Sequence, residues 1–273
     1  MNARIIYGTA WKKERTTALV VSAVLAGFRA IDTACQPKHY REDLVGAALE
    51  ILYQKHGYKR EDLFLQTKFT SINGQDTSQP LPYDPSNTVE VQVRSSFATS
   101  LRQLRTTYLD SYILHSPLDT YATTLQAWRI LVTLQDEGRV RAIGLSNAYD
   151  PTLLARLGED SGRAVQVVQN RWYERNGWDR EVVNGATPTM RNTSKSFWTL
   201  TGSPSLLSHP AIATFAGENK CTPPQAVYRF AQSLGITPLS GTTDETHMRE
   251  DLVAESLNQG EEFFGTLTKF IWG

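Results

Sequence analysis

Three things are scarce in this chain of 273 residues: cysteine, net charge and long apolar runs. The two cysteines, Cys35 and Cys221, are too few for a disulfide framework and are typical of a reducing compartment. The 28 lysine and arginine residues equal the 28 aspartate and glutamate residues, so no overall field attracts nucleic acid or an acidic membrane surface. We therefore expect the partner to be a small molecule.

Long apolar segments are also missing. No stretch approaches the roughly 18 consecutive apolar residues that a membrane span needs, and residues 1–15 lack the apolar centre of a secretory signal. We expect a cytoplasmic protein that binds neither nucleic acid nor membrane, with a monomer as the default oligomeric state.

The chain does contain a regular alternation of apolar runs with helix-like stretches, which predicts parallel strands joined by crossover helices. Its length is near the roughly 250 residues of an eight-stranded α/β barrel, so we expect a single (β/α)8 TIM barrel domain over residues 1–273, two small domains being the alternative. The expected strands are 4–8, 28–32, 63–68, 109–115, 141–146, 164–170 and 236–239. The expected helices are 13–26, 42–56, 86–105, 120–137, a short one from 151, 222–234 and 245–256, followed by a short tail.

One segment breaks the alternation. Between Val183 and Phe197, where a helix end and an apolar seventh strand should stand, the sequence NGATPTMRNTSKS has proline, glycine and two asparagines and no apolar run. The sequence leaves open whether strand seven is regular. A missing buried strand would forfeit on the order of several kcal/mol of apolar burial and weaken barrel closure.

Polar residues close four of the expected strands. Asp32, Lys68 and His115 end three of them, and Ser146 with Asn147 ends a fourth. Because the carboxyl ends of the strands of a parallel barrel meet at one rim, where such barrels carry their chemistry, we expect these side chains in one pocket.

Tyr40, which follows the first of these strand ends, completes a set suited to carbonyl reduction. Lowering the pKa of a tyrosine from about 10 by two to three units takes roughly 3–4 kcal/mol of phenolate stabilisation, which a lysine ammonium can supply. Lys68, paired with Asp32, fits this role, and a neutral His115 can hydrogen-bond the carbonyl oxygen. Singly, Asp32 could cap a turn and Lys68 could be a solvated strand end, but their joint placement favours a site.

Five motifs in this order resemble those of the aldo-keto reductase family: DTACQPKHYREDLVGAAL, LFLQTKF, LDSYILHSP, EGRVRAIGLSN and VQVVQNRW. The resemblance spans Gly8 to about Asp251. It implies an (α/β)8 barrel, reduction of an aldehyde or ketone to an alcohol, and a nicotinamide cofactor, NADP with NAD as the alternative, held without a Rossmann fold. It also implies a tetrad of aspartate, tyrosine, lysine and histidine.

Three members of this tetrad match directly, as Asp32, Lys68 and His115. The family places its tyrosine where this chain has Pro37, and Tyr40 stands three residues further on in a longer loop. Proline cannot donate a proton, and Tyr40 is the only tyrosine of that loop, so it takes the role. The alternative is a surface tyrosine in a site that has lost its acid.

By the same resemblance, Ser146, Asn147 and Gln169 grip the nicotinamide carboxamide, and Phe197 stacks on its ring, with Trp198 the next candidate. The segment SGTTDETHMRED resembles the adenosine-phosphate cradle, where hydroxyls, amides and a helix start suit a phosphate. The residues expected to bind cofactor are Gly8, Thr9, Asp32, Ser146, Asn147, Gln169, Phe197, Trp198, Thr199, Leu200, Ser240, Gly241, Thr242, His247 and Asp251.

The cradle departs from the family in one respect. Where many NADP-preferring members have a lysine and an arginine on the 2′-phosphate, this chain has Gly241 and His247. Thr242, His247 and Arg249 are therefore the expected contacts.

The substrate pocket is expected to include Trp11, Tyr40, His115 and Trp172, although a core role for Trp11 is equally open. No metal is expected, because no histidine and carboxylate have zinc spacing. Two other functions stay open: a barrel that has lost redox turnover and acts as a binding or regulatory protein, and a non-redox isomerase or dehydratase. The odd segment 184–195 and the displaced tyrosine are the motive for the first.

Overall fold

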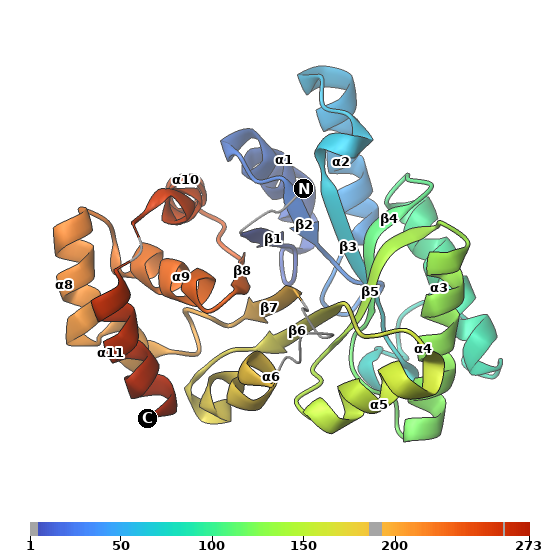
Figure 1. Ribbon diagram of the computed structural model, residues 1–273. Coiled ribbons are helices and arrows are strands. Elements are labelled where there is room, and N and C mark those ends of the chain that lie inside the picture. The colour runs from blue at the N-terminus through green and yellow to red at the C-terminus, as the bar shows by residue number, and fades with distance from the viewer. Residues whose placement is uncertain (1–4, 186–192, 259) are drawn as a thin grey trace.

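Eight parallel strands close into a barrel in the order of the chain, with helices around it (Figure 1). The computed structural model describes residues 5–185, 193–258 and 260–273. The strands are β1 Ile6–Gly8, β2 Ala30–Asp32, β3 Phe64–Phe69, β4 Leu109–Leu114, β5 Val140–Ser146, β6 Val167–Arg171, β7 Thr193–Phe197 and β8 Ile236–Ser240. The expected TIM barrel is confirmed.

Among the described residues, no helix is both long and apolar enough to cross a bilayer. The α-helices are α1 Thr16–Ala26, α2 Glu42–His56, α3 Val89–Gln103, α4 Tyr121–Asp136, α5 Pro151–Ser161, α6 Arg180–Asn184, α7 Pro204–Leu207, α8 Pro210–Asn219, α9 Pro223–Ser233, α10 Glu245–Val253 and α11 Glu261–Trp272. Short 3-10 turns are η1 Lys13–Arg15, η2 Arg60–Asp62, η3 Ile72–Gly74, η4 Glu174–Asp179 and η6 Ala254–Ser256.

Local chemistry sets where the helices begin and end. Gly57 ends α2 in the left-handed region, at φ 73°, where a residue with a Cβ is strained. The helix expected from residue 86 begins later, because Thr88 Oγ1 accepts from the Val91 amide and caps α3. Ser86 instead donates its amide and hydroxyl to Asp84 Oδ1, at 2.9 and 2.7 Å, so it belongs to the preceding turn.

Glycine permits two close approaches, one between outer helices and one in the barrel wall. A Cβ on Gly46 of α2 would lie 1.9 Å from the Gln103 carbonyl oxygen at the end of α3. A Cβ on Gly144 of β5 would lie 2.0 Å from the Val167 carbonyl oxygen of β6. The second approach matters for the site, because the same ladder sets the ends of β5 and β6 side by side.

The polar segment before Phe197 does form strand seven. β7 pairs with β6 from Val167↔Thr193 to Arg171↔Phe197, and it also pairs with β8, so it closes the barrel. Its hydrogen bonds come from neighbours on both sides, and its Lys195 is 5% exposed among polar side chains of the barrel interior. An apolar run is therefore not needed here. Residues 186–192 of the unusual segment lie outside the described residues.

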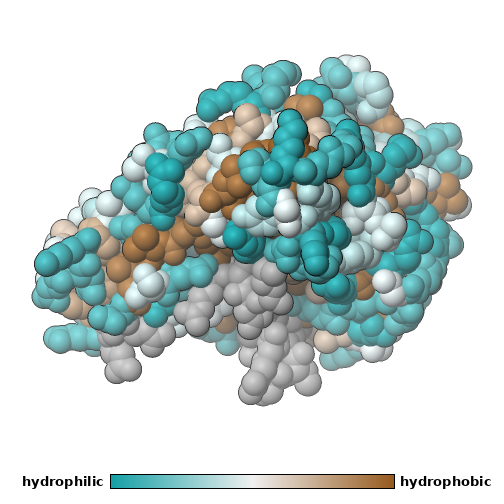
Figure 2. All heavy atoms as spheres, turned by 90° about the horizontal axis from the view of Figure 1, so that it is seen from above, coloured by the Kyte–Doolittle hydropathy of each residue, from teal (hydrophilic) through white to brown (hydrophobic). Residues whose placement is uncertain are grey.

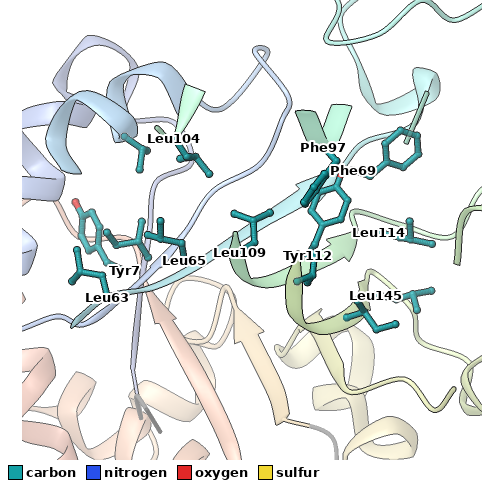
Figure 3. Packing of buried hydrophobic residues seen from close by; sticks show 14 of the residues in the cluster. Tyr7, Leu63, Leu65, Phe69, Phe97, Leu104, Leu109, Tyr112, Leu114 and Leu145 are labelled. Atoms are coloured by element: carbon teal, nitrogen blue, oxygen red, sulfur yellow. The ribbon is translucent and has the colours of Figure 1, made fainter. Parts of the chain in front are cut away.

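Apolar side chains pack outside the barrel in two clusters. The larger lies between the first strands and helices α1–α5, and Figure 3 shows part of it, including Leu65, Tyr112 and Leu145 from β3, β4 and β5. The second joins Trp172 to helices α8, α9 and α11. Instead of the expected short tail, the chain ends in α11, whose Leu267 is fully buried in this second cluster.

The outer surface is mixed. The face in Figure 2 is mainly hydrophilic, with apolar side chains confined to patches between hydrophilic ones.

Candidate active site

A buried ion pair lies at the carboxyl ends of β2 and β3. Lys68 Nζ donates to both carboxylate oxygens of Asp32 at 2.7 Å and to the Thr33 carbonyl oxygen at 2.8 Å. Lys68 and Asp32 are 1% and 2% exposed. Burial lowers the pKa of Lys68, and the Asp32 carboxylate opposes that shift. All three ammonium protons thus have an acceptor within this pair of strand ends.

The displaced tyrosine returns to this pair. In the loop after β2, the Tyr40 amide donates to the Gln36 carbonyl at 3.0 Å, which turns the chain back toward the barrel. The centre of the Tyr40 ring lies 5.3 Å from Lys68 Nζ and 5.9 Å from the centre of the His115 ring. The structure therefore brings all four expected tetrad residues together.

The electrostatics of Tyr40 differ from the expectation. Desolvation raises the pKa of the Tyr40 phenol, and the Asp32 carboxylate raises it further. The expected lowering by Lys68 does not occur, because the ammonium is bonded to Asp32 and Thr33. Tyr40 is therefore a protonated hydrogen-bond donor at neutral pH.

His115 is held neutral. Burial lowers the pKa of His115 to about 3, and the charges of Lys68, His39 and Arg171 add to the shift. Its Nδ1 lies 2.7 Å from Thr70 Oγ1. If the Thr70 hydroxyl donates this hydrogen bond, the ring proton is on Nε2 and is free to donate to a ligand. Our sequence reasoning missed Thr70, although it directly follows β3.

A polar network fills the barrel interior next to the ion pair. Gln66 Nε2 donates to Asp32 Oδ1 at 2.7 Å and to Gln169 Oε1. Gln66 Oε1 accepts from Ser111 Oγ at 2.9 Å and from Lys195 Nζ at 2.5 Å. Burial lowers the pKa of Lys195 to about 7. Gln66, Ser111 and Lys195 were not predicted, although Gln66 shares the inward face of β3 with Lys68, two residues on.

The ends of β5 and β6 present the amides expected to bind cofactor. Ser146 Oγ donates to the Gln169 carbonyl at 2.6 Å, and Asn147 Nδ2 donates to the His115 carbonyl at 2.9 Å. Phe197 ends β7 and is half-buried, next to Trp198, which is 50% exposed. The amides and the aromatic rings thus share one rim.

Strained backbone gathers at this rim. Trp11, Asn147 and Trp198 follow or end β1, β5 and β7, and all three are in the left-handed region, at φ 64°, 52° and 63°. Such conformations are uncommon for residues with a Cβ, and they cluster at functional sites. The strain therefore supports a binding site at the strand ends.

The segment after β8 is tied down by its own carboxylates. Ser240 Oγ donates to Asp251 Oδ2 at 2.6 Å, and burial raises the pKa of Asp251 to about 6. Asp244 Oδ1 accepts the amides of Thr246 and His247, at 2.7 and 3.1 Å, and so caps α10. The His247 side chain is exposed beside this cap.

One cation near this segment was missed from sequence. Lys12 is 8% exposed, and its Nζ donates to the Gly241 carbonyl. Burial lowers the pKa of Lys12, and Arg15 lowers it further. The Tyr7 hydroxyl donates to the next carbonyl, that of Thr242, at 2.9 Å. An ammonium and the chain after β8 are thus in contact where the cradle was expected.

Other expected site residues have structural partners. Thr9 Oγ1 donates to the Asp32 backbone carbonyl at 2.9 Å, and Gly8 pairs with Asp32 in the barrel ladder. Thr199 shares a hydrogen bond of 2.7 Å with Ser196. Leu200 packs, partly buried, against both apolar clusters.

The two tryptophans expected in the substrate pocket separate. Trp11 follows β1 and is 66% exposed, and the centre of its ring lies 3.8 Å from the centre of the His39 ring. Trp172 is 1% exposed and packs in the second apolar cluster, where the centre of its ring lies 6.1 Å from the centre of the Phe230 ring. Its place in the core, directed away from the inward face of β6, removes Trp172 from the pocket.

Among the described residues, no group of three or more histidine, cysteine or carboxylate side chains could hold a metal ion. The rim carries amides, aromatic rings, an ammonium, a carboxylate, a phenol and an imidazole.

Comparison with known proteins agrees with this arrangement. A family model described as the aldo/keto reductase family matches residues 4–271. Methylglyoxal reductase DkgA of Yersinia pestis is 26% identical over 261 residues, which cover 95% of this chain and 85% of the relative. A solved aldo/keto reductase structure from Brucella melitensis has a TM-score of 0.81 at 24% identity, covering 97% of this chain and 94% of its own. The aldo-keto reductase AKR2E5 complexed with NADPH has a TM-score of 0.79 at 20% identity, and the match covers 98% of this chain and 84% of AKR2E5. This last enzyme is from the silkworm, Bombyx mori.

Proposed function

The chain belongs to the aldo/keto reductase family, and from this premise we propose that it reduces an aldehyde or ketone to an alcohol with NADPH as cofactor. The observation that carries the proposal is the meeting of Asp32, Tyr40, Lys68 and His115 at one rim of the barrel. Related proteins agree, since one is a methylglyoxal reductase and another was solved with NADPH.

The residues at the rim fit a nicotinamide nucleotide. Phe197 offers a half-buried ring, and Asn147 at the same rim has an amide, which can donate to and accept from a carboxamide. We assign the carboxamide to Ser146, Asn147 and Gln169, whose side chains are each held by a hydrogen bond to a residue in or just after another strand. A reduced nicotinamide bound there supplies the hydride.

We assign the other end of the nucleotide to the segment after β8. The preference for NADP over NAD rests on three side chains near it, Lys12, His247 and Arg249, which can each donate a hydrogen bond to a phosphate. The Asp244 carboxylate already takes the first amides of α10, so the phosphate would depend on side chains such as Thr242 rather than on the helix start.

The four tetrad residues then divide the work on the carbonyl. Neutral His115 donates from Nε2 to the carbonyl oxygen and sets its position. As negative charge develops on that oxygen, Tyr40 gives it the phenolic proton. A raised pKa of Tyr40 does not prevent this step, because an alkoxide is a stronger base than a phenolate. The Tyr40 phenolate then regains a proton from solvent, and Lys68, paired with Asp32, keeps the Asp32 carboxylate from adding an uncompensated negative charge beside it.

The unusual segment before Phe197 and the displaced tyrosine were the two reasons to consider a barrel without redox turnover, and neither now supports it. β7 pairs with both neighbours, and the Tyr40 ring lies beside Lys68 despite its shifted position in sequence.

Tyr40→Phe tests the mechanism. We expect kcat for carbonyl reduction to fall about 10²- to 10⁴-fold, because the proton donor is lost, while NADPH still quenches tryptophan fluorescence with a similar Kd. Tyr53→Phe is the matched control, since it removes a buried hydroxyl that has no partner among the described residues, on α2 away from the rim. If Tyr40→Phe consumed NADPH at the rate of the wild type, the proton would have to come from another group.

A further inference from the structure

A cation stands at the active-site rim without an assigned role. Arg171 ends β6, two residues after Gln169 and therefore on the same inward face of the barrel. Its Nη1 donates to Asn147 Oδ1 at 3.1 Å. Its guanidinium carbon lies 5.3 Å from the centre of the Phe197 ring and 4.7 Å from that of Trp198. The guanidinium thus lies among the residues assigned above to the nicotinamide.

No carboxylate among the described residues pairs with this guanidinium. Its Nε is buried and has no hydrogen-bond partner in the part of the chain that the structure describes. Arg60 and Arg141 make the contrast, because both pair with Asp110, at 2.7 and 2.8 Å. A partly buried guanidinium with an unused donor is costly unless something supplies an anion.

The carboxylate of the tetrad does not supply that anion. Asp32 already accepts from Lys68 and Gln66. Arg171 is close enough to His115 for its charge to oppose protonation of the imidazole. The positive charge of Arg171 therefore acts on the residue that holds the reacting carbonyl.

The guanidinium is also held in one orientation. Phe197 and Trp198 contact it as cation–π partners, and Asn147 fixes one end of the fork. Nε is covered by the protein, so a ligand reaches this partly exposed side chain through Nη2, which donates to no acceptor among the described residues. The planar guanidinium and its N–H donors match the oxygens of a carboxylate.

We propose that Arg171 is an anion-binding subsite for the substrate, so that the preferred substrates are carbonyl compounds that also carry a carboxylate. The inference rests on the proposed reductase function and deepens it by naming the substrate class. The carboxylate lies against Arg171 while His115 and Tyr40 hold the carbonyl.

The test compares two acids with their uncharged methyl esters: succinic semialdehyde with methyl 4-oxobutanoate, and 4-carboxybenzaldehyde with methyl 4-formylbenzoate. We expect the wild type to prefer at least one acid over its ester in kcat/KM by about 10-fold or more. Arg171→Met should lower this acid-to-ester ratio about 10- to 100-fold, and Arg171→Lys should restore it only in part, because an ammonium lacks the fork. Arg175→Met, which removes an exposed positive charge from neighbouring η4, should leave the ratio unchanged.

Three results would overturn the inference. One is a wild type that reduces the esters as well as both acids. Another is a loss in Arg171→Met that is equal for acid and ester and accompanied by weaker NADPH binding, which would assign the cation to the cofactor. The third is an equal change in Arg175→Met, which would indicate only a long-range field.

Failure of the reductase function itself would look different, because no carbonyl would then be turned over by the wild type. In that case calorimetric titration with 4-carboxybenzaldehyde and its methyl ester decides the inference. Binding of the acid that is at least 10-fold tighter than binding of the ester, and lost in Arg171→Met, supports the subsite, and equal binding overturns it.

Discussion

At the scale of single residues, the hydroxyl of Thr70 orients a residue of the tetrad. The hydroxyl is bonded to His115 Nδ1, whereas the backbone carbonyl of Thr70 accepts separately from the hydroxyl of Tyr83 and the side-chain amide of Gln75. The loop after β3 therefore stays anchored without the hydroxyl, while the imidazole loses the contact that selects its tautomer.

Replacement of Thr70 by valine should accordingly affect catalysis more than stability. We expect kcat/KM to fall about 10-fold, the equivalent of one lost hydrogen bond of about 1–1.5 kcal/mol. Thr70→Ser keeps the hydroxyl and should recover most of the rate. Steady-state kinetics with thermal unfolding of both variants measures this. An equal loss in Thr70→Ser, or no loss in Thr70→Val, would contradict the assignment.

The residues of the site differ in whether they could be predicted from the sequence. Asp32, Lys68 and His115 could be found because each is a chemically distinctive residue at the end of an apolar run. Thr70 and Arg171 could not, because a threonine or arginine gains a role only from neighbours on other strands, which the sequence does not order in space. Alternation along β6, from Gln169 to Arg171, was the signal available.

At the scale of elements, β7 shows the limit of apolar patterning. Strands β2 to β6 were predicted to within three residues of their bounds, because their side chains are buried against apolar neighbours. β7 has the sequence TSKSF and gains its place from ladders with β6 and β8. Helix α11 was missed for a related reason, since its apolar residues matter only once α8 and α9 form a surface for them.

The buried Lys195 in β7 should lower the free energy of unfolding at neutral pH compared with an uncharged residue at the same position. Burial lowers the pKa of Lys195 from 10.5 to about 7 in the folded state. Between these values the unfolded chain binds more protons, so stability rises with pH across this window, and below pH 7 the full penalty applies. We expect Lys195→Met to raise the free energy of unfolding at pH 7, by on the order of a few kcal/mol, and by less near pH 10.

Urea unfolding of Lys195→Met at both pH values is the measurement. The exposed Lys55 provides the control, because Lys55→Met should change stability by less than about 0.5 kcal/mol at either pH. A variant less stable than the wild type at pH 7, or a difference that does not depend on pH, would refute this account of Lys195.

At the scale of the whole molecule, the barrel is supported unequally around its circumference. Helices α1–α5 share the larger apolar cluster, whereas α8, α9 and α11 share the smaller one (Figure 1). The smaller cluster includes the C-terminal helix, so the last residues of the chain stabilise the side of the barrel that carries β7.

Removal of buried volume from α11 should therefore destabilise the whole protein. Leu267→Ala empties a fully buried position and should cost about 2–5 kcal/mol of unfolding free energy. Thr266→Ala, next to it on the exposed face, should stay within about 0.5 kcal/mol of the wild type. Denaturant unfolding of both variants decides this, and similar stabilities would mean that α11 is only loosely attached.

The polar interior of the barrel couples the ion pair to the closure of the ring. Asp32, Gln66, Gln169 and Lys195 come from β2, β3, β6 and β7, so their shared hydrogen bonds exist only when the ring is complete. The contacts of Lys68 with Asp32 and Thr33 need only β2 and β3, whereas the Gln66 amide that bonds Asp32 gains further partners from β6 and β7, on the far side of the barrel. Closure by the last strands thus completes the support of a reactive pair that the first strands bring together.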